Sequence, residues 1–175
     1  MDALIIEPAR HDDLVPLHAL VESAYRGDTA RRGWTHEADL LDGQRTDEAT
    51  LTAMLDDPAQ RILVARDGEA LIGCVALTDK GDGICYLGML TVAPELQAAG
   101  LGRRLIVAAE NFAKTAFGAQ RVEMTVITQR AELIAWYERR GYARTGERRP
   151  FPHGNTRFGI PRDDSLAFIV LDRAL

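Results

Sequence analysis

The segment Gln97-Ala98-Ala99-Gly100-Leu101-Gly102 constrains this chain more than any other feature, because it joins a predicted strand directly to an amphipathic helix. The first N–H groups of a helix lack intrahelical partners and lie at the positive end of the helix dipole, so such a turn favours an anion. Gly100 and Gly102 let the backbone approach phosphate oxygens closely, and Arg103 and Arg104 add positive charge. We therefore expect a phosphate-binding turn.

The glycine pattern distinguishes this turn from two common nucleotide-binding motifs. No Gly-Lys-Ser/Thr follows it, which argues against a P-loop, and its spacing differs from the G-x-G-x-x-G of dinucleotide-binding folds. A tight strand–helix connection without any ligand is the alternative interpretation of the same residues.

Length and charge limit the kind of protein. The chain has 175 residues, close to the usual size of one domain, and we expect a single domain over residues 1–175. A formal net charge of −5 argues against a nucleic-acid partner, because binding a phosphate backbone needs many Lys and Arg contacts. No apolar run approaches the roughly 20 residues that span a bilayer, so no membrane association is expected.

The N-terminal segment indicates a cytoplasmic location, and the two cysteines indicate buried thiols. The segment Met1–Glu7 lacks the basic and long apolar regions of a signal peptide. Cys74 and Cys85 each lie inside an apolar run typical of a strand, which favours two buried thiols over a disulfide or a metal framework.

Apolar periodicity predicts an α+β fold. Apolar runs predict seven strands, at residues 4–8, 62–65, 71–77, 84–92, 122–127, 142–147 and 166–171. Three- and four-residue spacing predicts helices that begin at Asp12 or Asp13, Asp47, Leu101 and Ala131. Segments 27–46 and 148–164 are predicted to be loops, the first with short helical turns. Asp67-Gly68 predicts a hairpin within an antiparallel meander, whereas a helix separates the fourth strand from the fifth, as in a parallel pair.

Two motifs in order resemble one known family. The first is Gln97-x-x-Gly100-x-Gly102, preceded by Leu90-Thr91-Val92-x-Pro94; the second, Leu133–Tyr142, is similar to a family segment written LYEKLGF. Together they resemble the GNAT superfamily of N-acetyltransferases. The resemblance implies a mixed, mostly antiparallel sheet of six to seven strands, flanked by about four helices and splayed between the fourth and fifth strands.

The resemblance also implies a reaction, the transfer of an acetyl group from acetyl-CoA to a primary amine of a small molecule or peptide. In the family, the backbone of the fourth strand binds the pantetheine arm, which corresponds here to Leu90 and Val92. The pyrophosphate would bind the residues that follow, which are Gln97, Ala98, Ala99, Gly100, Leu101, Gly102 and Arg103. Tyr137 matches the residue that serves the departing thiolate, and no metal is implied.

Several alternatives stay open. Tyr137 could instead pack its ring beside Leu133 and Trp136, and the domain could be a catalytically silent acyl-CoA-binding or protein-interaction domain. A transferase for longer acyl chains or hydroxyl acceptors is a third interpretation. The stretch 128–130 has no Asn where many family members place one, and Gln129 is the candidate substitute.

The base and the acceptor site are less constrained by the sequence. No acidic residue lies between Ile84 and Val92, where several family members place a glutamate, so the candidate bases are Glu22, His36, Glu37 and Glu123. Each could equally be a solvated charge. The expected acceptor-site residues are Trp34, His36, Glu37 and Phe151. They come from two irregular segments rich in Arg and aromatic rings, residues 31–37 together with 42–45, and residues 148–155. The alternative is that Trp34 and Phe151 anchor ordered loops or the surface of a homodimer.

Overall fold

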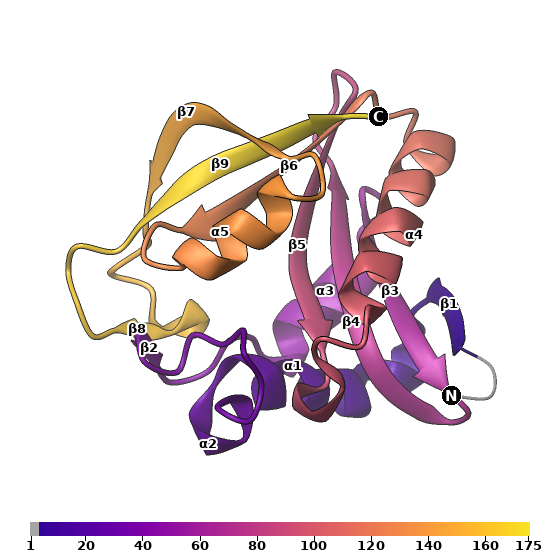
Figure 1. Cartoon of the computed structure of the whole chain (residues 1–175). Coiled ribbons are helices and arrows are strands. Elements are labelled where there is room, and N and C mark those ends of the chain that lie inside the picture. The colour runs from indigo at the N-terminus through magenta and orange to yellow at the C-terminus, as the bar shows by residue number, and fades with distance from the viewer. Residues whose placement is uncertain (1–3) are drawn as a thin grey trace.

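A computed structural model describes residues 4–175, apart from the side chain of Phe158. Residues 1–3, on which the expectation of a chain without a signal peptide partly rests, lie outside the described residues. A seven-stranded sheet runs in the order β1-β3-β4-β5-β6-β9-β7 (Figure 1). Its strands are β1 (Leu4–Pro8), β3 (Gln60–Asp67), β4 (Ala70–Asp79), β5 (Ile84–Val92), β6 (Arg121–Ile127), β7 (Ala143–Pro150) and β9 (Ala167–Ala174). The α+β fold and the seven strands expected from the sequence are confirmed.

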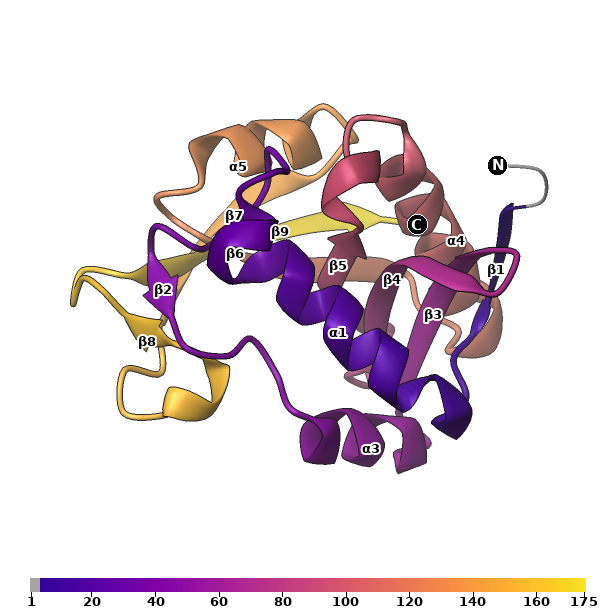
Figure 2. The same cartoon turned by 90° about the horizontal axis from the view of Figure 1, so that it is seen from below.

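Helices cover both faces of this sheet. The α-helices are α1 (Leu14–Tyr25), α2 (Gly27–Ala30), α3 (Glu48–Asp56), α4 (Leu101–Ala116) and α5 (Ala131–Glu138). Helix α4 packs against β3, β4 and β5, while α1 and α3 pack on the same strands from the other side (Figure 2). Short 3-10 helices occupy His11–Asp13, Pro94–Leu96 and Thr156–Phe158.

Local sequence signals account for several element ends. Asp47 caps α3, and its side chain accepts a hydrogen bond from the Thr50 N–H at 2.6 Å. Gly68, with φ of +60°, turns the chain between β3 and β4. Gly100, with φ of +82°, precedes α4 in a left-handed conformation that few other residues adopt.

The sheet opens between β5 and β6. Their parallel pairing involves only the first three residues of β5, Ile84 to Tyr86, against Arg121 to Glu123. Further along, β5 keeps its antiparallel pairing with β4, but the register shifts between Cys74 and Ala76, and Met89 has φ of +51°. The expected splay between the fourth and fifth strands is thus present, and it leaves one edge of β5 without strand pairing from Leu87 onward.

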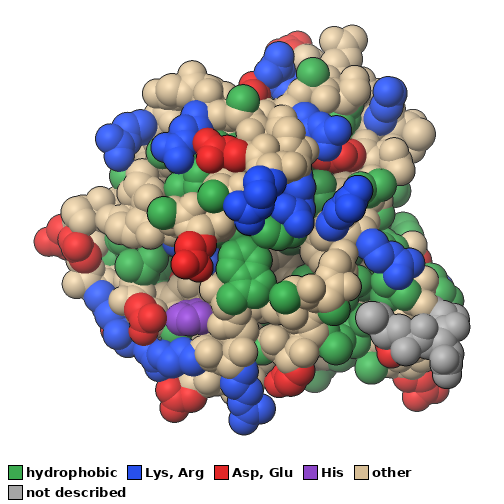
Figure 3. All heavy atoms as spheres, viewed as in Figure 1, with side chains coloured by type: hydrophobic (Ala, Val, Ile, Leu, Met, Phe, Trp, Pro, Cys, Tyr) green, Lys and Arg blue, Asp and Glu red, His purple; other side chains and the backbone are tan. Residues whose placement is uncertain are grey.

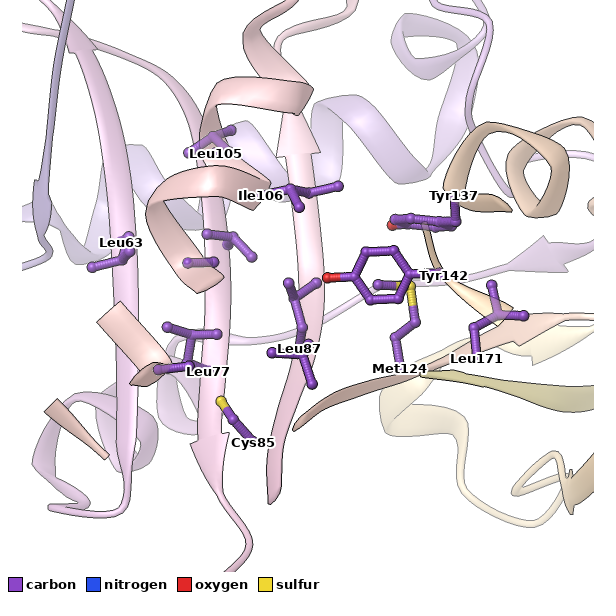
Figure 4. Close-up of a cluster of buried hydrophobic side chains, with 14 of the residues drawn as sticks. Leu63, Leu77, Cys85, Leu87, Leu105, Ile106, Met124, Tyr137, Tyr142 and Leu171 are labelled. Carbon is purple, nitrogen blue, oxygen red and sulfur yellow. The ribbon is translucent and has the colours of Figure 1, made fainter. Parts of the chain in front are cut away.

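The larger core lies between the sheet and the helices α4 and α5. Alternate residues of β5 are buried, and Leu105 and Ile106 of α4 pack against Leu87. Tyr137 and Tyr142 extend this core towards β6, beside Met124 (Figure 4). A second cluster packs α1 and α3 on the other face. Within the described part of the chain, no helix has the length and apolar character needed to cross a membrane.

The two cysteines are buried free thiols, as the sequence predicts. Cys74 lies in the cluster under α1, and Cys85 lies in the core under α4. Burial raises the pKa of Cys74 to about 12 and that of Cys85 to about 11, so both stay protonated near neutral pH.

The predicted loops contain more order than the sequence indicated. Within segment 27–46 the chain forms α2 and the short strand β2 (Leu41–Asp42), which pairs with β8 (Ile160–Pro161) from the second loop. Strand β7 extends to Pro150, past its predicted end. Asp13 does not cap α1 with its side chain; it accepts a hydrogen bond from the Arg10 N–H and pairs with Arg66.

Candidate active site

Two cavities meet at the splay between β5 and β6. The first cavity extends along the end of β5 towards the start of α4 and the side of α5. The second cavity lies between β5 and β6, under the loops around residues 37–45 and 151–152. The residues that line both are Tyr25, Leu90, Arg130, Leu133 and Tyr137. The two cavities therefore lie side by side at the splay.

The turn at residues 97–103, which the sequence predicts to bind phosphate, forms one end of the first cavity. Its wall includes most of the predicted turn and strand residues, namely Leu90, Val92, Gln97, Ala98, Gly100, Gly102 and Arg103. Ala99 is exposed and Leu101 is buried in the core, and neither side chain lines the cavity. A Cβ atom on Gly102 would lie 3.4 Å from the ring of Trp136, so a larger residue here would narrow the space beside α4.

The side chain of Gln97 ties this turn to two other segments. Its oxygen accepts a hydrogen bond from the Thr35 N–H at 3.1 Å, and its amide nitrogen donates to the Val92 carbonyl at 3.3 Å. A Cβ atom on Gly33 would lie 2.2 Å from the Gln97 oxygen, so a larger residue there would displace the Gln97 side chain. Gln97 thereby holds the segment around Thr35 against the end of β5.

Arginine side chains line the opposite wall of the first cavity. Arg140 donates to the Trp136 carbonyl at 2.7 Å, and its guanidinium lies 3.5 Å from the centroid of that ring. Its Nε is buried and, among the described residues, has no hydrogen-bond partner. Burial, followed by the charges of Arg139 and Arg103, lowers the pKa of Arg140. An anion in the cavity would relieve this repulsion, and Lys and Arg side chains gather between α4 and α5 (Figure 3).

Tyr137 lies in the wall shared by the two cavities. Its side chain is 6% exposed, and its ring packs 5.1 Å from Trp136 and 5.9 Å from Tyr142. Burial, and secondarily the proximity of Tyr25, raises the pKa of Tyr137 well above its usual value. The phenol is therefore neutral near pH 7, and it can donate a hydrogen bond at the junction.

The open edge of β5 is partly engaged by side chains. Tyr25 donates a hydrogen bond from its hydroxyl to the Leu90 carbonyl, and Gln97 donates to the Val92 carbonyl. Each carbonyl oxygen has a second lone pair. The edge can therefore still accept a hydrogen bond from an extended ligand that lies along it.

The second cavity is lined by three arginines and one carboxylate. Glu37 is 9% exposed and forms ion pairs with Arg26 and with Arg130, the latter at 3.3 Å. Burial alone would raise the pKa of Glu37, but the charges of Arg130, Arg26 and Arg45 hold this pKa below its usual value. Arg45 is half-buried, with its guanidinium 5.2 Å from the centroid of the Tyr25 ring.

Apolar side chains form the other side of the second cavity. Phe151 is buried and lies 5.4 Å from the ring of Phe168, and both line the cavity together with Met124, Val126 and Ile127. Tyr86 completes this side, with its hydroxyl 2.7 Å from that of Thr125. The cavity thus has one cationic side and one apolar side.

The predicted acceptor-site residues divide among different places. Glu37 and Phe151 line the second cavity. Trp34 lines the first cavity, with its ring 6.3 Å from Trp136. His36 lines neither cavity; its Nδ1 accepts from the Ala38 N–H at 3.2 Å.

The other candidate bases lie outside both cavities. Glu22 accepts hydrogen bonds from the N–H groups of Arg45 and Thr46, so it anchors a loop. Glu123 pairs with Arg149 at 3.3 Å. Gln129 faces a shallow surface hollow, whereas its neighbour Arg130 lines both cavities.

The sequence assigned no role to four residues that line the cavities, namely Tyr25, Arg26, Arg130 and Arg140, whereas Arg45 lies in a segment expected to line the acceptor site. Arg140 stands in the second motif, just beyond the end of α5, and its charge was the signal available in the sequence. The others come from segments without a motif, and only the fold brings them together. Among the described residues, no group of three or more His, Cys, Asp or Glu is arranged to hold a metal ion.

Comparisons with known proteins agree with the geometry. The model of the acetyltransferase (GNAT) family matches residues 20–142. An acetyltransferase of the GNAT family from Streptococcus pneumoniae is 20% identical, with a TM-score of 0.70 over 99% of this chain and 100% of that one. The ribosomal-protein-S18-alanine N-acetyltransferase of Escherichia coli is 15% identical, with a TM-score of 0.70 over 98% and 94%. The spermidine/spermine N-acetyltransferase SpeG of Vibrio cholerae is 18% identical, with a TM-score of 0.69 over 99% and 93%.

At these identities the likeness to solved structures concerns the fold. No curated protein sequence matches the chain.

Proposed function

The chain belongs to the acetyltransferase (GNAT) family, and from this premise we propose that it transfers an acetyl group from acetyl-CoA to a primary amine of a small molecule or peptide. The observation that carries the proposal is the position of Tyr137, a neutral phenol in the wall shared by the two cavities. Similar structures include N-acetyltransferases whose names give a ribosomal-protein alanine or spermidine as the acceptor, and both acceptors are amines.

The residues of the first cavity fit acetyl-CoA. The N–H groups at the start of α4, together with Arg103 and Arg140, would hold its phosphates. The open edge of β5 at Leu90 and Val92 would hold the pantetheine arm. Bound there, acetyl-CoA supplies a thioester at the junction of the two cavities.

The reaction forms one bond and breaks another. The amine nitrogen of the acceptor bonds to the acetyl carbonyl carbon, and the carbon–sulfur bond breaks with its electron pair going to sulfur. A phenol near pKa 10 is a weaker acid than a thiol near 8.5, so full proton transfer from Tyr137 would be uphill by roughly 2 kcal/mol, and burial increases this cost. Tyr137 therefore stabilises the thiolate as a hydrogen-bond donor, and water supplies the proton that makes the thiol.

The amine must lose a proton before it attacks. Among the described residues that line the second cavity, Glu37 is the one carboxylate, and its two arginine partners make it a poor base. An alkyl amine near pKa 10.4 needs roughly 4 to 5 kcal/mol to lose its proton at pH 7, whereas an α-amine near 8 needs only about 1 kcal/mol. We propose that water accepts this proton.

A second candidate function is the binding of acyl-CoA without turnover. The ion pairs of Glu37 with Arg26 and Arg130 favour this function, because they make the carboxylate of the second cavity a poor base. Purified protein mixed with acetyl-CoA and a panel of amines, with free thiol followed over time, separates the two. Amine-dependent thiol release supports the transferase, whereas calorimetric binding of acetyl-CoA without release supports the silent binder. Neither binding nor release would contradict both.

A further inference from the structure

The charges of the second cavity do not balance. Arg26, Arg45 and Arg130 line it, while Glu37 supplies one negative charge. Glu37 is already engaged by Arg26 and Arg130, and Arg130 also donates to the Thr35 hydroxyl at 2.5 Å. Among the described residues this leaves the guanidinium of Arg45 without a carboxylate partner. The cavity therefore has an excess of positive charge for its occupant to neutralise.

Arg45 is held in place although its charge is unmatched. The carboxylate of Glu22 accepts hydrogen bonds from the backbone N–H groups of Arg45 and Thr46, at 2.7 and 2.8 Å. The guanidinium lies over the ring of Tyr25, and the hydroxyl of that tyrosine reaches the Leu90 carbonyl. The Tyr25 side chain thus lies between the Arg45 guanidinium and the Leu90 carbonyl, where the two cavities meet.

The opposite side of the cavity selects for an apolar group. Phe151 and Phe168 lie there with Met124 and Val126, and the cavity as a whole has an empty volume of about 1030 Å³, including its open mouth. A small molecule can therefore place a charged group on one side and a hydrocarbon or aromatic group on the other.

Resting on the proposed acetyltransferase function, we infer that the acceptor is a small amine that also carries a carboxylate and an apolar side group, and that Arg45 binds the carboxylate. Apolar amino acids and their analogues form this chemical class. The planar guanidinium offers two parallel N–H donors, which match the two oxygens of a carboxylate. A substrate with an amide or a second amine in place of the carboxylate lacks this pair of oxygens.

The same cations affect the amine. Positive charges near an ammonium group disfavour its charged form, so the arginines promote the neutral amine in a cavity whose one carboxylate is a poor base. They also oppose a polyamine, which would bring further positive charge beside Arg45.

The test compares amines that differ only at the carboxylate. Thiol release from acetyl-CoA is measured with phenylalanine, phenylalaninamide and phenethylamine, with the corresponding leucine set, and with spermidine. The amide has the less basic amine, so reactivity alone would favour it. We expect kcat/KM to be about 10- to 100-fold higher for the amino acid than for its amide or amine.

The Arg45→Gln variant assigns this preference to the residue. It should lose most of the preference while keeping acetyl-CoA affinity, which is measured by calorimetry, and Arg45→Lys should retain part of the preference. Arg144→Gln is the matched control, because Arg144 is exposed and pairs with Glu138 outside both cavities.

Three results would overturn the inference. If amides, amines or spermidine are acetylated as well as the amino acids, or if Arg45→Gln keeps the preference, the proposed acetyltransferase stands and the inference fails. If no amine releases thiol, the proposed function fails, and the inference falls with it.

Discussion

The hydroxyl of Tyr25, at the end of α1, donates a hydrogen bond to the carbonyl oxygen of Leu90 on β5. This hydrogen bond lies where the two cavities meet. It gives the Leu90 carbonyl a donor on the part of β5 that does not pair with β6. It therefore stabilises the opened edge of the sheet on which the proposed reaction depends.

Tyr25→Phe removes this hydrogen bond and keeps the ring beside Arg45. We expect the free energy of unfolding to fall by about 1 to 2 kcal/mol, because the partly buried Leu90 carbonyl loses its partner. Urea denaturation measures the change. Tyr86→Phe is the matched control, because the Tyr86 hydroxyl bonds to the Thr125 hydroxyl, which can bond to water instead. An equal fall in the free energy of unfolding in the two variants would contradict the role of Tyr25.

Tyr137→Phe should separate catalysis from binding. Loss of the hydrogen bond to the departing thiolate should lower kcat by about 10- to 100-fold, while calorimetric affinity for CoA changes less than about twofold. Tyr142→Phe removes a hydroxyl that bonds to Glu110 in the adjoining core and should retain turnover while lowering stability. A Tyr137→Phe enzyme with normal kcat would assign this residue to packing alone.

The buried phenol also predicts the pH profile. Burial raises the pKa of Tyr137 above its ordinary 10, so the hydroxyl keeps its proton, and its ability to donate, throughout the range below 10. Turnover should therefore rise with pH as the acceptor amine loses its proton, and then level off. Steady-state assays from pH 6 to about 10 provide the test, and a fall in rate within this range that disappears in Tyr137→Phe would show that the phenol ionises early.

Arg140→Gln should weaken phosphate binding. Arg140 lines the first cavity and would pair with a phosphate there, so we expect the Kd for CoA to rise about tenfold or more. Pantetheine lacks the phosphates, and its affinity should not change. Arg139→Gln is the control, because Arg139 is exposed and lines neither cavity. Equal losses for CoA and pantetheine would indicate a structural role for Arg140.

Glu37 links stability to pH. Its pKa in the folded protein is lowered from 4.5, so the stability that it contributes is fully present above that value and is lost as the pH falls through the lower folded pKa. Glu37→Gln leaves two buried arginines without their shared partner and should lower the free energy of unfolding at pH 7 by about 3 to 5 kcal/mol.

Denaturant titrations at pH 7, 4 and 3 measure both effects. The wild-type protein should lose stability at the acid end, and Glu37→Gln should lose less there. Glu132→Gln, at an exposed position, serves as the control. Equal pH dependence in wild type and Glu37→Gln would contradict the linkage.

Much of the fold was predictable because its signals are local. The cap at Asp47, the turn at Gly68 and the helical spacing after Gly100 each act within a few residues, and the structure confirms the corresponding elements. The two-residue pairing of β2 with β8 was not predictable, since strands this short carry no periodicity and join segments about 120 residues apart.

The site was only partly predictable for the same reason. The turn at Gln97 to Arg103 is contiguous and carries its own signature. The cationic side of the second cavity unites Arg26, Glu37, Arg45 and Arg130, and no sequence spacing relates these four residues. Trp34 shows the limit clearly: its loop looked suited to an acceptor, but Gln97 holds that loop beside the first cavity.

The central proposal, acetyl transfer to an amine at the junction beside Tyr137, is tested most directly by the stoichiometry of its products. Purified protein is incubated with acetyl-CoA and the best amine of the panel, free thiol is quantified, and the acetylated amine is measured by mass spectrometry. We expect one acetylated amine for each thiol released, at a rate that falls in Tyr137→Phe. Thiol release without acetylated amine, or no release with any amine, would contradict it.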